Sequence, residues 1–176
     1  SASPCCALVM LSAAGLERLE KTESSSFSCD LRKWWNIMEA YENGGHAYHA
    51  TMPTDSLRRF RDIMKETEEY GFEKVRAEQQ ELGDKVRAML VAKGIKSVAG
   101  DGFQAPGVVV SYTDDKGIQT GKKFAELGFQ IAAGVPLQCD EPEDYQSFRL
   151  GLFGLDKLHN IGRTVEKLEK ALSAID

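Results

Sequence analysis

Apolar side chains recur at helical spacing through most of the first 94 residues of the chain. This period predicts amphipathic helices, and capping residues and glycines mark where they begin and end. The expected helices cover residues 13–21, the segment from the N-cap Asp30 to Gly44, residues 54–70, and residues 72–93 after an interruption at Gly71.

Beyond Gly94 the spacing becomes that of strands. Short runs of Val, Ile and Phe are separated by Gly, Pro and Asp, which is typical of strands joined by turns. We expect strands at 95–98, 108–112, 129–132 and 148–153, a helix at 116–127, and a final helix at 158–175. This order predicts a small α+β sandwich with the sheet on one side and helices on the other.

The first apolar run, residues 5–11, has no polar positions at all. Such a run predicts a strand that is buried on both faces of an α/β sheet. The helical pattern that follows offers no neighbouring strand, so either this segment is not a strand or its sheet partners lie upstream of Ser1. Without them, residues 1–70 should be poorly stable or self-associated.

Composition narrows the class of protein. The chain has 176 residues, of which 42% are hydrophobic, enough for a core without a metal or disulfide. The net charge of −5 disfavours nucleic acid and anionic membranes as partners, and no apolar run approaches the ~18 residues of a membrane span. Four unpatterned cysteines are typical of a reduced, cytoplasmic protein.

Two places could carry chemistry. The loop 46–54 has two imidazoles, a phenol and hydroxyls just before a helix, which suits an anionic group such as phosphate; the alternative is a helix cap with surface side chains. Arg149 lies in an apolar strand, where a guanidinium needs a carboxylate ligand or a structural ion pair with Glu143 or Asp144. A zinc site from Cys5, Cys6, His46 and His49 is disfavoured, since adjacent cysteines on a strand point to opposite faces.

Two motifs in order along the chain resemble those of a known enzyme family. The stretch YHATMP at 48–53 is similar to the Tyr-His-x-Thr-x-Pro loop, and FRLGLFG at 148–154 is similar to the Arg-Ile-Gly-x-x-Gly strand, of class V pyridoxal-phosphate aminotransferases. The nearest group is the alanine–glyoxylate/serine–pyruvate type. A Gly-x-x-Ile-x-x-Gly segment at 128–134 and an Asn-Ile helix start at 160 extend the resemblance to most of the chain.

The resemblance implies the C-terminal half of a fold-type I transferase. Residues 1–70 would be the end of the large cofactor-binding domain, and residues 71–176 the small C-terminal domain. The lysine that carries the cofactor in this family would lie a few residues before Ser1, ahead of a turn formed here by Ser3, Pro4 and Cys5. No catalytic residue is therefore expected in this chain, and we expect the chain alone to be inactive.

The resemblance also implies ligands and partners. Tyr48 and Thr51 would bind the phosphate of pyridoxal 5′-phosphate across a homodimer, and Arg149 would bind the substrate carboxylate. The implied reaction moves an amino group between a small amino acid, alanine or serine, and a 2-oxo acid, glyoxylate or pyruvate. The alternatives are a 2-aminoethylphosphonate–pyruvate transaminase and a non-catalytic dimerisation or binding remnant of the same fold.

Overall fold

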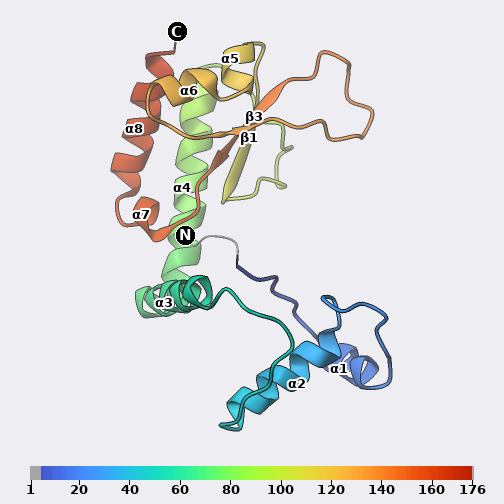
Figure 1. Cartoon of the computed structure of the whole chain (residues 1–176). Coiled ribbons are helices and arrows are strands. Elements are labelled where there is room, and N and C mark those ends of the chain that lie inside the picture. The colour runs from blue at the N-terminus through green and yellow to red at the C-terminus, as the bar shows by residue number, and fades with distance from the viewer. Residues whose placement is uncertain (1–4, 176) are drawn as a thin grey trace. The chain divides into compact units, whose positions relative to one another are not determined.

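A computed structural model describes residues 5–175, and Figure 1 traces the chain. The described part of the chain divides into two compact units, residues 5–63 and residues 64–175. The division falls inside one helix, α3 (Thr54–Tyr70). The domain boundary at residues 70 and 71 that the sequence suggests stays a prediction.

The unit of residues 5–63 contains helices that begin at capping residues, of which Asp30 is the one expected from the sequence. α1 (Ala13–Glu20) starts after Ser12, whose hydroxyl accepts from the Gly15 amide, and α2 (Leu31–Glu42) starts after Asp30, whose carboxylate accepts from the Lys33 amide. Each cap satisfies a backbone N–H that has no partner inside its own helix. No described residue of this unit is fully buried.

The predicted strand at the start of the chain is wrong for the residues that the structure describes. Residues 5–11 form no strand, and the side chains of Leu8, Val9 and Met10 are exposed. A strand forms only where a second strand satisfies its backbone groups, and none pairs with this segment among the described residues. Ser3 and Pro4 of the predicted turn lie outside the described residues.

The second unit is organised around one long helix, α4 (Phe72–Ala92). Gly71 separates it from α3 with φ at 100°, and Gly94 follows its end with φ at 79°, both in the left-handed region that favours glycine. The helices that follow are α5 (Lys116–Gln119), α6 (Lys122–Glu126), α7 (Leu155–Leu158) and α8 (Ile161–Ser173).

Two of the expected helices differ from the prediction. The helix predicted at 116–127 breaks at Gly121, which has φ at 77° and separates α5 from α6. The helix predicted at 158–175 begins later, as α8 after Asn160, whose side chain accepts from the Arg163 amide, and Leu158 belongs to the separate α7. In each case a residue suited to a turn or a cap interrupts an apolar period that runs on across it.

Three antiparallel strands form the sheet, in the order β1-β3-β2. They are β1 (Val108–Tyr112), β2 (Ala132–Ala133) and β3 (Ser147–Gly151). The strand predicted at 95–98 is reduced to one bridge between Ser97 and Ser111, and the strand predicted at 129–132 to the two residues of β2.

The two faces of this sheet have different surroundings. On one face Val109, Phe148 and Leu150 are buried in a core with α4, α6 and α8. On the other face Val110 and Ala132 pair with Arg149 from either side, and these side chains remain partly or fully exposed. The predicted sandwich, with helices on one side of the sheet, is therefore confirmed (Figure 1).

Candidate functional site

Tyr48 and Thr51 lie together on the loop that precedes α3. The Tyr48 Oη and the Thr51 Oγ1 are 3.2 Å apart, within hydrogen-bond distance. Both residues are exposed, with 78% of Tyr48 accessible. The two hydroxyls are thus adjacent and open to solvent, an arrangement that can donate two hydrogen bonds to one anion.

The imidazole of His49 connects this loop to a segment of the same unit that is distant in sequence. The Nε2 of His49 lies 2.9 Å from the carbonyl oxygen of Phe27. The ring also contacts those of Phe27 and Trp34, with centroids 4.3 Å and 5.0 Å away. The sequence indicated no such role for His49, because these partners lie 22 and 15 positions earlier in the chain. The one indication of this role in the sequence is the position of His49 between Tyr48 and Thr51.

Arg149 lies on the central strand of the sheet, on the face opposite the core. Its Nε donates to the Ala133 carbonyl oxygen at 2.8 Å. No carboxylate among the described residues lies within 4.0 Å of its guanidinium, so the ion pair with Glu143 or Asp144 is absent there. The terminal nitrogens of Arg149 therefore remain available to a ligand.

The structure brings together only part of the predicted set. Tyr48 and Thr51 are in contact within residues 5–63. Arg149 belongs to residues 64–175, where its neighbours come from β1 and β2. The two candidate anion-binding groups thus belong to different units, and each is described within its own unit.

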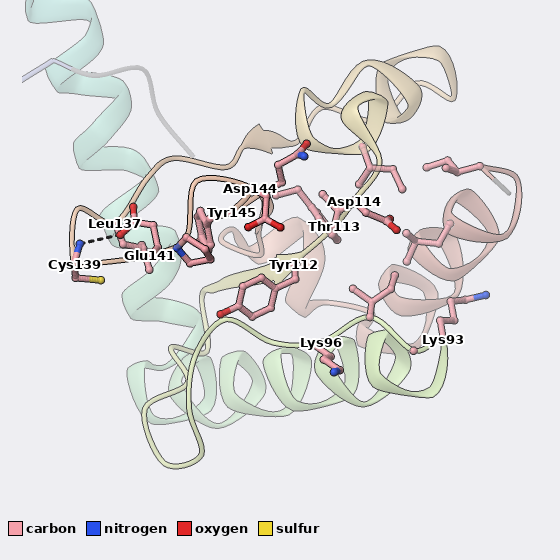
Figure 2. A pocket seen from close by; sticks show the side chains of 18 residues that line it. Lys93, Lys96, Tyr112, Thr113, Asp114, Leu137, Cys139, Glu141, Asp144 and Tyr145 are labelled. Carbon is pink, nitrogen blue, oxygen red and sulfur yellow. Dashed lines mark hydrogen bonds between the residues drawn. The ribbon is translucent and has the colours of Figure 1, made fainter.

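A cavity that the sequence did not indicate lies in the second unit. It has a volume of about 820 Å³ and is lined by the segment 93–96 that follows α4, by residues of β1, α5, β3 and α8, and by the loop 137–146 (Figure 2). Its charged lining residues are Lys93, Lys96, Asp114, Glu141 and Asp144.

Glu141 is a fixed anion at the edge of this cavity. Its carboxylate accepts from the backbone N–H groups of Cys139 and Gln138, each at 2.8 Å. These hydrogen bonds lower the pKa of Glu141 from 4.5 to about 2. None of the three site residues predicted from the sequence lines the cavity.

Residues 5–175 contain neither a cluster of metal ligands nor a membrane-spanning helix. Within that range no three His, Cys, Asp or Glu side chains gather closely enough to hold a metal ion, and all four cysteines are free. Over the same range, no helix has the length and apolar character needed to cross a membrane.

The fold of this chain is similar to parts of two solved structures. The alanine–glyoxylate aminotransferase of Nostoc sp. superposes with a TM-score of 0.71 at 16% identity, over 93% of this chain and 42% of that protein. The ureidoglycine–glyoxylate aminotransferase of Bacillus subtilis superposes with a TM-score of 0.59 at 20% identity, over 92% of this chain and 40% of that protein.

These likenesses confirm the predicted fold. The chain is an α/β structure with the fold of part of a class V, fold-type I aminotransferase, as expected for its C-terminal portion. It spans less than half the length of either solved structure. No family model matches the sequence. No curated protein matches it either.

Proposed function

We propose that this chain is part of a pyridoxal-phosphate-dependent aminotransferase that acts on a small amino acid and a 2-oxo acid. The observation that carries the proposal is the pairing of the Tyr48 and Thr51 hydroxyls, 3.2 Å apart, in a chain with an aminotransferase fold. Both similar structures are named as glyoxylate aminotransferases, which favours glyoxylate as the amino acceptor.

The donor chemistry of the chain fits the cofactor and the substrate. The two exposed hydroxyls of Tyr48 and Thr51 match the oxygens of a phosphate monoester, and the free end of Arg149 matches a carboxylate. Bound pyridoxal phosphate supplies an electron-withdrawing ring that accepts the charge left when the substrate Cα–H bond breaks.

Each residue then has a defined task. Tyr48 and Thr51 donate hydrogen bonds to phosphate oxygens and fix the position of the cofactor, which we place across a homodimer interface. Because Nε of Arg149 donates to the Ala133 carbonyl oxygen, its two terminal nitrogens would be left to donate to the substrate carboxylate. Orientation of this kind lowers the entropic cost of reaching the reactive geometry. We assign the proton transfer to no residue of this chain.

The test is a set of substitutions in the complete gene product, assayed with alanine and glyoxylate. Arg149→Ala should lower kcat/KM by about 10² to 10⁴ and leave cofactor affinity nearly unchanged, because a two-pronged contact with charge is lost. Arg149→Lys should recover little, since an ammonium lacks the planar fork. Arg163→Ala, at an exposed arginine of α8, is the matched control.

Tyr48→Phe combined with Thr51→Ala should do the reverse and raise the dissociation constant of pyridoxal phosphate. Tyr41→Phe, at an exposed tyrosine of α2, should change nothing. In a mixed dimer, a Tyr48/Thr51 variant subunit and a subunit lacking the cofactor lysine should together restore one active site. If Arg149→Ala left kcat/KM within about threefold for every small amino acid tried, the carboxylate role would be refuted.

A further inference from the structure

His49 stands between the two hydroxyl residues in sequence, yet its ring packs on a segment outside their loop. We propose that His49 is a positioning residue, which holds the loop 46–53 against residues 27–34 and so keeps the Tyr48 and Thr51 hydroxyls together for a phosphate group. This inference deepens the proposed function and rests on it.

The hydrogen bond of His49 fixes both the ring orientation and its tautomer. The partner of Nε2 is the carbonyl oxygen of Phe27, at 2.9 Å, and a carbonyl oxygen can only accept. Nε2 therefore carries the hydrogen and donates it. This bond spans 22 positions in the chain and connects the loop to the segment before α2.

Two aromatic rings hold the imidazole in place from other directions. The ring of Phe27 lies 4.3 Å away and is tilted by 39°, while Trp34 meets the imidazole edge to face at 5.0 Å and 73°. Trp34 is itself braced, since its Nε1 donates to the Ser28 carbonyl oxygen at 2.8 Å. The segment 27–34, against which His49 packs, is thus itself held by a side-chain hydrogen bond.

The loop has little else to hold it. Gly45 donates to the Ala40 carbonyl oxygen before the loop, and Thr54 donates to that of Met52 after it. Between them, the backbone of residues 46–51 makes no hydrogen bond to the backbone of any other described residue. Side-chain contacts therefore help to determine where Tyr48 and Thr51 lie, and the hydrogen bond and ring contacts of His49 reach outside the loop.

Fixing the loop in advance matters for binding. If the loop were mobile, it would have to become ordered when the phosphate group binds to the two hydroxyls. The loss of conformational entropy would then weaken the binding. Removal of the His49 ring should consequently weaken binding only when the two hydroxyls are present, because the histidine itself need not touch the ligand.

The experiment compares His49→Ala with His46→Ala in the complete gene product. His46 is exposed and makes no hydrogen bond, ion pair or ring contact with any described residue, so it is a matched control in the same loop. NMR relaxation order parameters of the amides of residues 46–52 should fall below about 0.6 in His49→Ala and stay unchanged in His46→Ala. His49→Gln, which keeps an N–H donor, should recover part of the order, and His49→Phe, which keeps a ring, another part.

Binding is then measured with pyridoxal phosphate and with pyridoxal, which lacks the phosphate. His49→Ala should raise the dissociation constant of pyridoxal phosphate about 5- to 20-fold and leave that of pyridoxal unchanged. In a protein that already carries Tyr48→Phe and Thr51→Ala, His49→Ala should add less than about twofold. A general loss of fold would instead lower the affinity for both probes in both backgrounds.

The outcomes separate the two levels of the argument. Unchanged order parameters of the loop in His49→Ala, or an undiminished effect in the background without the hydroxyls, would overturn the positioning role and leave the proposed function standing. No phosphate-dependent binding by the unsubstituted protein would overturn the proposed function and the positioning role with it.

Discussion

Residues 5–63 and residues 64–175 have helices of similar amphipathic pattern but very different burial. In α8 the apolar positions Leu168 and Leu172 are 7% and 4% exposed. In α2, of nearly the same length, Met38 and Tyr41 are 53% and 60% exposed. An apolar stripe therefore indicates a face that can be buried, and its burial depends on a second element that packs against it.

The difference has an energetic consequence for each unit. An isolated helix of about 12 residues is marginal in water, and most of the stability of a helix in a protein comes from packing of its apolar face. In the second unit α4 supplies Leu82, Val86 and Leu90 to one continuous core with the sheet. The first unit has contacts between helices and caps, without one fully buried side chain among its described residues.

The largest difference between the two units should appear in the hydrogen exchange rates of the chain as a dilute monomer. Amides of residues 108–175 should exchange at least about 100-fold more slowly than those of residues 5–50, because core amides open only with the whole unit while unpacked helices open locally. The measurement is exchange followed by mass spectrometry of peptides. Uniformly strong protection would contradict the comparison, and concentration-dependent protection of residues 5–50 would indicate self-association.

A pair of glycine substitutions should separate the two units by a smaller amount. A Cβ at Gly83 in α4 would lie 2.7 Å from the Pro106 carbonyl oxygen and 2.9 Å from its Cα, so backbone has to move. We expect Gly83→Ala to lower the free energy of unfolding by about 1–3 kcal/mol.

Gly15→Ala is the matched change in α1, where the nearest atom to a new Cβ is the Ser12 Oγ at an ordinary 3.4 Å. The higher helix propensity of alanine should stabilise that helix by about 0.5–1 kcal/mol. Circular dichroism during urea unfolding measures both variants. Equal effects of the same sign would show that the two helices have similar surroundings, contrary to the burial.

Sequence-based prediction succeeded where the cause was local. Asp30 does cap a helix, and Gly71 and Gly94 do separate elements, since a cap or a left-handed backbone depends on the residue itself. It failed where the outcome needs a distant partner: residues 6–11 form no strand, and residues 95–98 keep only the bridge at Ser97.

The candidate site divides in the same way. The Tyr48 and Thr51 hydroxyls are three positions apart on one loop, so their contact follows from the local sequence. The Nε of Arg149 is held by Ala133, which sheet register brings beside it from 16 positions away. The cavity beside Glu141 also depends on tertiary packing, since β1, α8 and the segment 93–96 all line it.

The smallest effect should come from the loop around Glu141, a part of the second unit whose order depends on local hydrogen bonds. The backbone N–H groups of Cys139 and Gln138 stabilise the carboxylate and hold its pKa at about 2, below the ordinary 4.5. This contribution to stability is fully present above about pH 4.5 and is lost as the pH falls toward about 2, because the unfolded state binds the proton first.

The change should be confined to the loop, since Glu141 lies outside the core. NMR titration of the Gln138 and Cys139 amides should give a midpoint near pH 2, while core residues such as Phe148 shift little. Glu141→Gln should remove that midpoint and speed amide exchange at both positions, whereas Glu143→Gln, at an exposed neighbour, should do neither. A midpoint near 4.5 in the unsubstituted chain would mean that the two amide hydrogen bonds do not persist in solution.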